Sequence, residues 1–387
     1  MRIVRLANFV APRSGGLRTA MRALGEGYLA AGHEPVLVVP GPRDADEYTS
    51  QGRVVTLRAP LVPFSGGYRV LVNAPRLASV LGDLAPDRLE VSDRTTLRWT
   101  GAWARRHGVP SVMVSHESVV GLLSIGWLGR SRFGRFAGRR LAWPTARLAD
   151  TLNTRTAKYY DTVLCTTHWA AAEFERLGVP NLARVPLGVD LDLFHPRLHS
   201  PAVRDRYADP GQILIVHCGR LSVEKRPDRS IDALAALIAA GVPASLVVVG
   251  DGPQRRRLHR RAARLPVRFT GFVHDRSALA ALLASADVVV APGPVETFGL
   301  AALEALACGT PVVVSGSSAL PEVVGEAGVA VTGENFGAGV REVLGWPTAQ
   351  RRAAARARAE EFGWPAAVAG FLKAHRLATE VPREGQP

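Results

Sequence analysis

The chain alternates short apolar, β-branched runs with longer helical patterns, and this alternation starts again halfway along the sequence. Strands separated by helices in this way form parallel sheets with helices on their faces. The runs predict strands at Ile3–Leu6, Pro35–Val39, Val54–Leu57, Arg88–Val91, Ser111–Ser115, Thr162–Thr166, Gln212–Cys218, Ser245–Gly250, Val267–Thr270, Asp287–Ala291 and Pro311–Ser315. The main helical patterns cover Gly16–Ala31, Val70–Leu84, Pro227–Ala240, Gln254–Leu265, Arg276–Ser285 and Leu300–Cys308. The sequence therefore predicts an α/β protein with two doubly wound Rossmann-like domains.

The boundary between the two predicted domains lies in a segment that breaks both periodicities. Two prolines and a glycine interrupt the stretch Val185–Pro196, as expected for an interdomain connection. A length of 387 residues also suits two domains of ordinary size. We therefore assign residues 1–187 to the first domain and 188–362 to the second. We expect a last helix at about 363–378 to pack back on the first domain.

Cysteine spacing and hydropathy exclude several classes of protein. The three cysteines, Cys165, Cys218 and Cys308, are far apart and form no C-x-x-C pair, so neither a disulfide framework nor a zinc site is expected. No apolar run of transmembrane length occurs, and residues 1–8 alternate charged with apolar side chains instead of forming a signal peptide. We expect a cytoplasmic protein.

The net charge of +14 raises the question of a polyanionic partner. Only three of the 48 basic residues are lysine, so a coding bias towards arginine explains the excess equally well. The excess lies mainly in the first half of the chain. No recognised nucleic-acid-binding motif accompanies it, so we expect no nucleic-acid partner.

Two glycines follow the first predicted strand, at the point where a helix begins. Gly15 and Gly16 carry no side chains, so an anion can approach the backbone N–H groups at the start of that helix. A plain strand-to-helix turn explains the pair equally well. The G-x-G-x-x-G spacing of NAD-dependent enzymes is absent here.

Two basic residues follow the first strand of the second predicted domain. Arg220 and Lys225 lie at the carboxyl edge of the sheet, where α/β folds bind ligands. Two fixed cations at this edge suit a diphosphate. Each residue taken alone is equally well an ordinary surface charge.

Two carboxylates follow a later strand of the same domain. Glu296 lies in a loop and Glu304 eight residues further on, just over two turns along the next helix. Carboxylates spaced in this way lie on a similar helix face and can accept hydrogen bonds from sugar hydroxyls. A helix start with a buried polar residue is the alternative.

Together these motifs resemble those of the family-4 retaining glycosyltransferases, whose GT-B architecture has two Rossmann-like domains facing a cleft. The resemblance rests on E-x7-E at 296–304, G-R-L-x-x-E-K at 219–225 and G-V-D at 188–190, and it covers nearly the whole chain. Over these motifs and residues 7–19 the sequence is similar to actinobacterial mannosyltransferases of phosphatidylinositol mannoside synthesis. The similarity implies GDP-mannose as the donor, an anionic glycolipid as the acceptor and an α-(1→6) linkage.

The resemblance also implies a role for each matching residue. Glu296 contacts donor-sugar hydroxyls and Glu304 the ribose. Arg220 and Lys225 stabilise the departing diphosphate, because preplaced cations best meet charge that develops on a leaving group. The remaining donor contacts are Gly15, Gly16, Phe298, Gly299 and Leu300 around the phosphates, and Val273 and Asp275 at the base. Ala278 departs from the pattern, since some relatives place a basic residue there, near guanine.

The resemblance implies front-face transfer with retention, which requires neither a Ser-His-Asp triad nor a metal ion, because the departing diphosphate can itself accept the acceptor's proton. We therefore expect no cofactor.

By the same resemblance His116 reaches the reacting sugar across the cleft, whereas a lone histidine at a strand end is more often structural. Asp44-Ala-Asp46 matches the metal-binding D-x-D of the other glycosyltransferase fold, but it lies in a predicted surface loop, so no metal site is expected.

A basic, aromatic segment, Leu122–Asp150, occurs in the first predicted domain. It interleaves tryptophan and phenylalanine with six arginines, so it can lie on an anionic membrane without spanning it. The protein would then be peripheral on the inner face of the plasma membrane. A solvated helix pair explains the segment equally well. Arg18, Tyr68 and Arg69 are candidates for the acceptor headgroup by approximate position.

Two other functions fit the same motifs. One is a family-4 glycosyltransferase that uses another nucleotide sugar, another lipid or a soluble acceptor, because the first domain lacks a sharp specificity motif. The other is an inactive protein that binds nucleotide sugars. Retention of Glu296, Glu304, Arg220 and Lys225 argues against the inactive protein.

Overall fold

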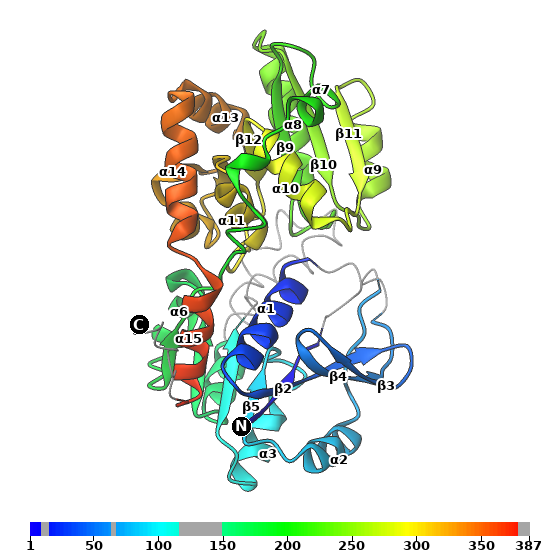
Figure 1. The fold of residues 1–387 in the computed structure, drawn as a ribbon, viewed down its shortest axis with the longest axis vertical. Coiled ribbons are helices and arrows are strands. Elements are labelled where there is room, and N and C mark those ends of the chain that lie inside the picture. The colour runs from blue at the N-terminus through cyan, green and yellow to red at the C-terminus, as the bar shows by residue number, and fades with distance from the viewer. Residues whose placement is uncertain (9–14, 63–66, 116–148, 378–387) are drawn as a thin grey trace, which may run out of the picture.

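The computed structural model of the chain describes residues 1–8, 15–62, 67–115 and 149–377. These residues form two α/β domains stacked along the long axis of the molecule (Figure 1). Each domain has a mainly parallel sheet with helices on its faces. The structure thus confirms the two doubly wound Rossmann-like units that the sequence predicts.

The first sheet has the strand order β3-β4-β2-β1-β5-β6-β7-β8, and all neighbours are parallel except β3 and β4. Its strands are β1 (Arg2–Leu6), β2 (Glu34–Gly41), β3 (Ala45–Thr49), β4 (Gly52–Arg58), β5 (Arg88–Val91), β6 (Ser111–Ser115), β7 (Thr162–Cys165) and β8 (Leu182–Arg184). Its helices include α1 (Gly16–Ala30), α2 (Ala74–Leu84), α3 (Trp99–Arg106) and α6 (His168–Glu175). The strand order reverses beside β1, so the loop after β1 opens at a topological switch point.

The second sheet is parallel throughout, in the order β11-β10-β9-β12-β13-β14. Its strands are β9 (Ile213–Cys218), β10 (Ala244–Val249), β11 (Val267–Gly271), β12 (Val288–Ala291), β13 (Val312–Ser315) and β14 (Gly328–Val331). The accompanying helices are η1 (Pro196–Leu198), α7 (Pro201–Asp205), α8 (Pro227–Ala239), α9 (Arg255–Arg261), α10 (Arg276–Ser285), α11 (Leu300–Ala307), α12 (Leu320–Val324), η2 (Gly325–Ala327), α13 (Phe336–Gly345) and α14 (Thr348–Glu360). Here the switch point lies between β9 and β12.

The structure corrects the expectation for Asp44-Ala-Asp46. Residues Ala45–Thr49 form the edge strand β3 and not a surface loop. Most side chains of this strand are exposed, so it lacks the apolar run by which a strand is recognised in a sequence. Asp46 pairs with Arg53 and Asp44 with Arg76, each at 2.7 Å.

Two stretches of chain connect the domains and touch each other. In the first stretch, the N–H of Val189 donates to the Phe362 carbonyl of the second at 2.8 Å. From there the chain enters α15 (Trp364–Ala374), which leaves the second domain and packs on the first (Figure 1). A Cβ on Gly27 of α1 would lie 2.3 Å from Val368 of α15, so only glycine permits this approach of the two helices.

A buried ionic network ties the end of α15 to the first sheet. Glu90 of β5 and Arg5 of β1 are buried and pair at 2.9 Å. The Tyr28 hydroxyl donates to Glu90 at 2.7 Å, and Nε2 of His375 lies 3.2 Å from the same carboxylate. One carboxylate thus joins β1, α1 and the C-terminal end of α15.

Two sequence predictions fall on parts of the chain that the structure does not describe. Residues 116–148 include His116 and nearly all of the basic, aromatic segment. Of the helices in the described residues, none is both long enough and apolar enough to cross a bilayer.

Candidate active site

Three of the loops that carry predicted donor-binding residues leave a sheet at its switch point. Arg220 and Lys225 follow β9, and Glu296 follows the neighbouring strand β12. Gly15 and Gly16 follow β1 of the first sheet in the same way. The carboxyl ends of strands at such a point form the usual ligand crevice of an open α/β sheet.

The N-termini of two helices from different domains meet here. A Cβ on Gly16, the first residue of α1, would lie 3.6 Å from the side chain of Leu300, the first residue of α11. Gly299 has a φ of +85°, and a Cβ there would lie 2.1 Å from Leu320, so the turn requires glycine. Neither Gly15 nor Gly299 has a side chain that could cap its helix. Both helix starts can therefore offer N–H groups to an anion, and both helix dipoles favour negative charge there.

The first domain holds the loop between Glu296 and α11. The Thr167 hydroxyl donates to the Thr297 carbonyl at 2.9 Å. Phe298 is buried, and its ring meets Phe362 edge-on with 6.0 Å between ring centres. Phe298 can therefore serve a donor only through its backbone.

The structure joins two of the predicted catalytic residues directly. Lys225 and Glu296 form an ion pair between the loops after β9 and β12, and both side chains remain partly exposed. Arg220 lies on the same loop as Lys225, and its guanidinium carbon is 4.2 Å from the centre of the Tyr68 ring in the first domain. Lys225, Glu296 and Arg220 thus lie at the switch point of the second sheet, with Arg220 reaching the first domain.

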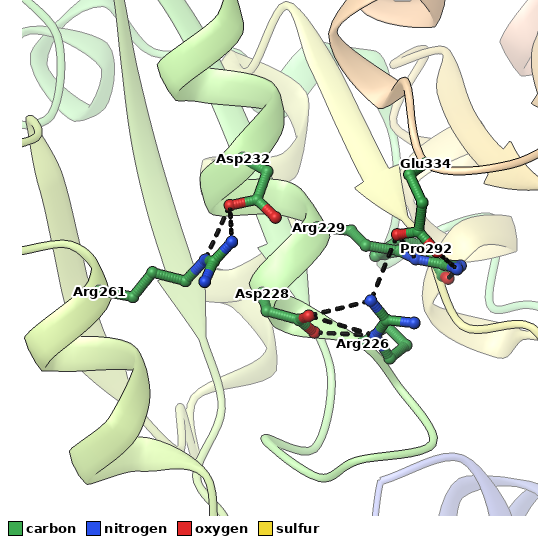
Figure 2. Close-up of polar contacts among 7 residues, drawn as sticks. All are labelled: Arg226, Asp228, Arg229, Asp232, Arg261, Pro292 and Glu334. Carbon is green, nitrogen blue, oxygen red and sulfur yellow. Dashed lines mark hydrogen bonds and ion pairs between the residues drawn. The ribbon is translucent and has the colours of Figure 1, made fainter. Parts of the chain in front are cut away.

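Further ionic contacts, which the sequence analysis missed, brace the loop that carries Glu296 (Figure 2). Arg229, in the first turn of α8, is buried and donates to the Pro292 carbonyl at 3.2 Å, at the start of that loop. The same guanidinium forms a bidentate ion pair with the carboxylate of Glu334, in the turn before α13. Hydrogen bonding from Arg229 holds the pKa of Glu334 below its ordinary value.

The residue after Lys225 belongs to the same brace. Arg226 has a φ of +48°, in the left-handed region that costs a residue with a side chain about 1–2 kcal/mol. Its guanidinium pairs with Asp228 at 3.1 Å and with Glu334 at 3.2 Å, and these contacts help to hold the strained turn (Figure 2). Arg226 adjoins a motif, but Glu334 lies 108 residues away at no diagnostic spacing.

The second predicted carboxylate, Glu304, is buried on α11 and has a basic partner. Arg276, at the start of α10, donates to Glu304 at 2.7 Å, and its guanidinium carbon lies 4.8 Å from the centre of the Phe194 ring. Burial raises the pKa of Glu304, and the charge of Arg276 opposes that rise. A ribose hydroxyl that reaches Glu304 would therefore meet a carboxylate already oriented by Arg276. The sequence analysis missed Arg276, two residues before Ala278, although it adjoins Asp275.

The two residues predicted to contact the nucleotide base, Val273 and Asp275, lie in the loop between β11 and α10. The Asp275 carboxylate caps α10 by accepting from the N–H groups of Ser277 at 2.8 Å and Ala278 at 3.2 Å. Val273 is half-buried against the apolar core. If Asp275 contacts the nucleotide base, it must do so while its carboxylate also caps α10.

The three acceptor candidates of the first domain do not form one cluster in the described contacts. Tyr68 contacts Arg220 of the second domain. Arg69 donates to the Ala59 carbonyl at 2.5 Å and so closes its own loop. Arg18 is exposed in the first turn of α1. Their roles towards an acceptor stay predictions.

Family models match both domains of the chain. The glycosyl transferase 4-like domain matches residues 15–188, and the group 1 glycosyl transferases match residues 212–345. The chain is 53% identical over 377 residues to the GDP-mannose-dependent α-(1-6)-phosphatidylinositol dimannoside mannosyltransferase of Mycobacterium tuberculosis (strain ATCC 25177 / H37Ra). That match covers 96% of this chain and 95% of the mycobacterial protein.

Solved structures with the same fold include two that match almost end to end. HepE of Anabaena, in complex with UDP and glucose, has a TM-score of 0.72 at 17% identity, covering 96% of this chain and 98% of that one. Sucrose-phosphate synthase of Thermosynechococcus elongatus has a TM-score of 0.74 at 21% identity, covering 97% and 98%. These likenesses confirm the GT-B fold. With the family models and the mycobacterial relative, they show that the chain belongs to the group 1 glycosyltransferases and is a glycosyltransferase enzyme.

Proposed function

We propose that the protein transfers mannose from GDP-mannose to a phosphatidylinositol mannoside and forms an α-(1→6) linkage. The observation that carries this proposal is the 53% identity to the mycobacterial mannosyltransferase over 96% of the chain. The Lys225–Glu296 pair and Arg220, at the switch point of the second sheet, are compatible with a nucleoside diphosphate sugar in that crevice.

The chemistry follows from the positions of these groups. The diphosphate lies at the N-termini of α1 and α11, facing Arg220 and Lys225, and Glu296 accepts hydrogen bonds from the donor sugar. The bond between the anomeric carbon and the diphosphate oxygen breaks, and the acceptor oxygen forms a bond on the same face of the sugar. The acceptor's proton passes to the departing diphosphate. The two cations stabilise the charge that grows on this leaving group.

Product analysis tests the proposal. The protein is incubated with GDP-mannose or UDP-glucose in the presence of phosphatidylinositol dimannoside, and the lipid products are examined by mass and linkage analysis. We expect one added hexose in α-(1→6) linkage with GDP-mannose and none with UDP-glucose. Transfer from UDP-glucose alone, or no transfer to the lipid from GDP-mannose, would contradict the proposal.

The two carboxylates should divide between nucleotide and sugar. Glu304→Gln should weaken GDP binding by about 10- to 100-fold, because hydrogen bonds to a charged group contribute about 1.5–3 kcal/mol. Glu296→Gln should leave GDP affinity unchanged and impair turnover of the intact donor. Calorimetry with GDP alone measures the first effect, and thermal unfolding checks that both variants are folded. Equal losses of GDP affinity would refute this division.

We propose that transfer needs no metal ion or other cofactor, because Arg220 and Lys225 supply the positive charge that faces the diphosphate. Initial rates with GDP-mannose in excess EDTA should therefore equal those with added magnesium or manganese. A metalloenzyme assayed in the same buffers serves as the control for chelation. A rate that collapses in EDTA and returns with a divalent cation would contradict the proposal.

We further propose that the protein binds the membrane peripherally through the basic, aromatic segment. Each arginine near an anionic surface contributes about 1 kcal/mol, so replacing Arg132, Arg135, Arg139 and Arg140 by glutamine should lower the affinity for phosphatidylinositol vesicles by about two orders of magnitude or more. Vesicle sedimentation measures the effect. Binding should also weaken with salt, because the Debye length shortens to about 3 Å at 1 M.

The second domain offers a matched control for this variant. Arg255, Arg256, Arg257 and Arg260 are exposed on α9, so their replacement by glutamine removes the same charge from another surface. That control should still sediment with anionic vesicles. Equal losses in both quadruple variants would indicate attraction by net charge alone and not by the segment.

A further inference from the structure

In the described structure, an aromatic contact joins the two domains at Arg220, the cation that is predicted to face the diphosphate. The guanidinium carbon of Arg220 lies 4.2 Å from the centre of the Tyr68 ring, and both side chains are half-buried. A guanidinium this close to the face of a tyrosine is attracted by the ring quadrupole, and the attraction grows as the pair is desolvated. Tyr68 therefore acts on the charge of Arg220 from the opposite domain.

The backbone beside Arg220 is fixed by the neighbouring strand. The N–H of Gly219 donates to the Val249 carbonyl at 3.0 Å, and the N–H of Leu221 donates to the Asp251 carbonyl at 3.1 Å. A Cβ on Gly250 would lie 1.9 Å from the Gly219 carbonyl oxygen, so the two loops are in close contact. The long Arg220 side chain still has considerable rotamer freedom. Contacts at its far end therefore decide where its charge lies.

The position of Tyr68 is set by the first domain. The N–H of Val62 donates to the Tyr68 carbonyl at 2.8 Å, which joins the two arms of the loop between β4 and α2. Asn8, two residues after β1, accepts from the N–H of Leu71 at 2.9 Å and so ties the end of this loop to the sheet. Tyr68 thus presents its ring from an anchored loop.

We propose that Tyr68 is a positioning residue for Arg220, whose ring holds the guanidinium where it meets the donor diphosphate. The inference rests on the proposed function and deepens it. The first domain, through Tyr68, places a cation that the second domain supplies. Charge on the departing diphosphate is then fully stabilised only while the two domains are in contact.

Turnover without acceptor separates this role from acceptor binding. Slow hydrolysis of the donor by water requires the same departure of the diphosphate but no lipid. Tyr68→Leu should lower the kcat of this hydrolysis by about 3- to 30-fold, because it removes the cation–π attraction. Tyr68→Phe keeps the ring and should retain most of the activity. If Tyr68 acted through the acceptor, hydrolysis would be unchanged and the KM for the lipid would rise, which would overturn the inference.

A double-mutant cycle tests the link to Arg220. In the Arg220→Ala background, Tyr68→Leu should cause no further loss of hydrolysis and no further loss of GDP affinity. Additive losses would overturn the inference. Tyr48→Leu is the matched control, since Tyr48 is an exposed tyrosine on β3 of the same domain. Its hydrolysis rate and its thermal unfolding should equal those of the wild type.

The donor can be varied so that the two proposals fail separately. The cycle is run with GDP-mannose and with UDP-glucose, which share the diphosphate that faces Arg220. A wild type that uses only UDP-glucose contradicts the proposed donor, while the Tyr68 comparison proceeds on UDP-glucose. If Tyr68→Leu and Arg220→Ala have additive effects on hydrolysis of the donor that the protein uses, the inference about Tyr68 is contradicted. The proposed donor is not affected by that outcome.

Discussion

Replacing Lys225 or Arg220 by alanine should lower kcat by about 10²- to 10³-fold, because in the proposed mechanism each change removes a preplaced cation that faces charge growing on the diphosphate. Initial rates at saturating GDP-mannose measure the effect. Both side chains are only partly buried, so the fold should survive. Lys225→Ala also frees Glu296 from its ion pair, but Glu296 is itself partly exposed and water can solvate it.

A basic residue away from the crevice provides the control for these variants. Arg257 is exposed on α9, and Arg257→Ala changes the net charge by the same amount. Its kcat should equal that of the wild type, and all three variants should unfold at similar temperatures. Near-normal turnover in both Lys225→Ala and Arg220→Ala would refute the assignment of the diphosphate site.

Replacing Glu90 by glutamine should lower the free energy of unfolding by about 3–5 kcal/mol, because it leaves the buried Arg5 guanidinium without its charge partner. The change also weakens the contacts of Tyr28 and His375 and so loosens the end of α15 on the first domain. Urea unfolding followed by circular dichroism measures the loss. Glu26→Ala, which removes the exposed Arg22–Glu26 pair, should cost less than about 1 kcal/mol.

The contribution of Glu90 should depend on pH with a definite sign. Burial alone would raise the pKa of Glu90, but the charge of Arg5 and hydrogen bonds from His375 and Tyr28 outweigh burial and lower that pKa well below its ordinary value. A carboxylate with a lowered pKa stabilises the fold above its unfolded pKa of about 4.3, and the stabilisation is lost as pH falls further. The difference between wild type and Glu90→Gln should therefore be constant near neutral pH and shrink below about pH 4. A difference that grows in acid would contradict this account.

Much of the site could be predicted because its motifs are local. Arg220 and Lys225 lie five residues apart after one strand, and Glu296 and Glu304 lie eight apart after another. Recognising the strands was enough to place Arg220 and Lys225 at the carboxyl edge of the sheet and Glu296 in a loop after a later strand. That these strands are neighbours, which brings Lys225 to Glu296, comes from the structure. The same local reasoning could not find Glu334, whose contacts with Arg226 and Arg229 depend on the turn before α13.

The fold was predictable for a similar reason, with one informative failure. Buried parallel strands such as β10 are apolar along their whole length, because helices cover both faces of the sheet. The edge strand β3, which pairs only with β4 in the sheet, has mostly exposed side chains, so no apolar pattern marks it. The prediction of a surface loop was therefore wrong for Ala45 and Asp46, which begin β3, whereas Asp44 precedes the strand.

The sequence by itself determined the two Rossmann-like domains and the loops that carry the glycines, cations and carboxylates, because strand periodicity and motif spacing are properties of nearby residues. Only the tertiary structure decided which side chains from distant segments meet. Tyr68 lies against Arg220, Arg276 against Glu304, and Glu90 joins three elements that are far apart in the chain. No spacing rule encodes such contacts, since they depend on how the packed cores place loops and helix ends in space.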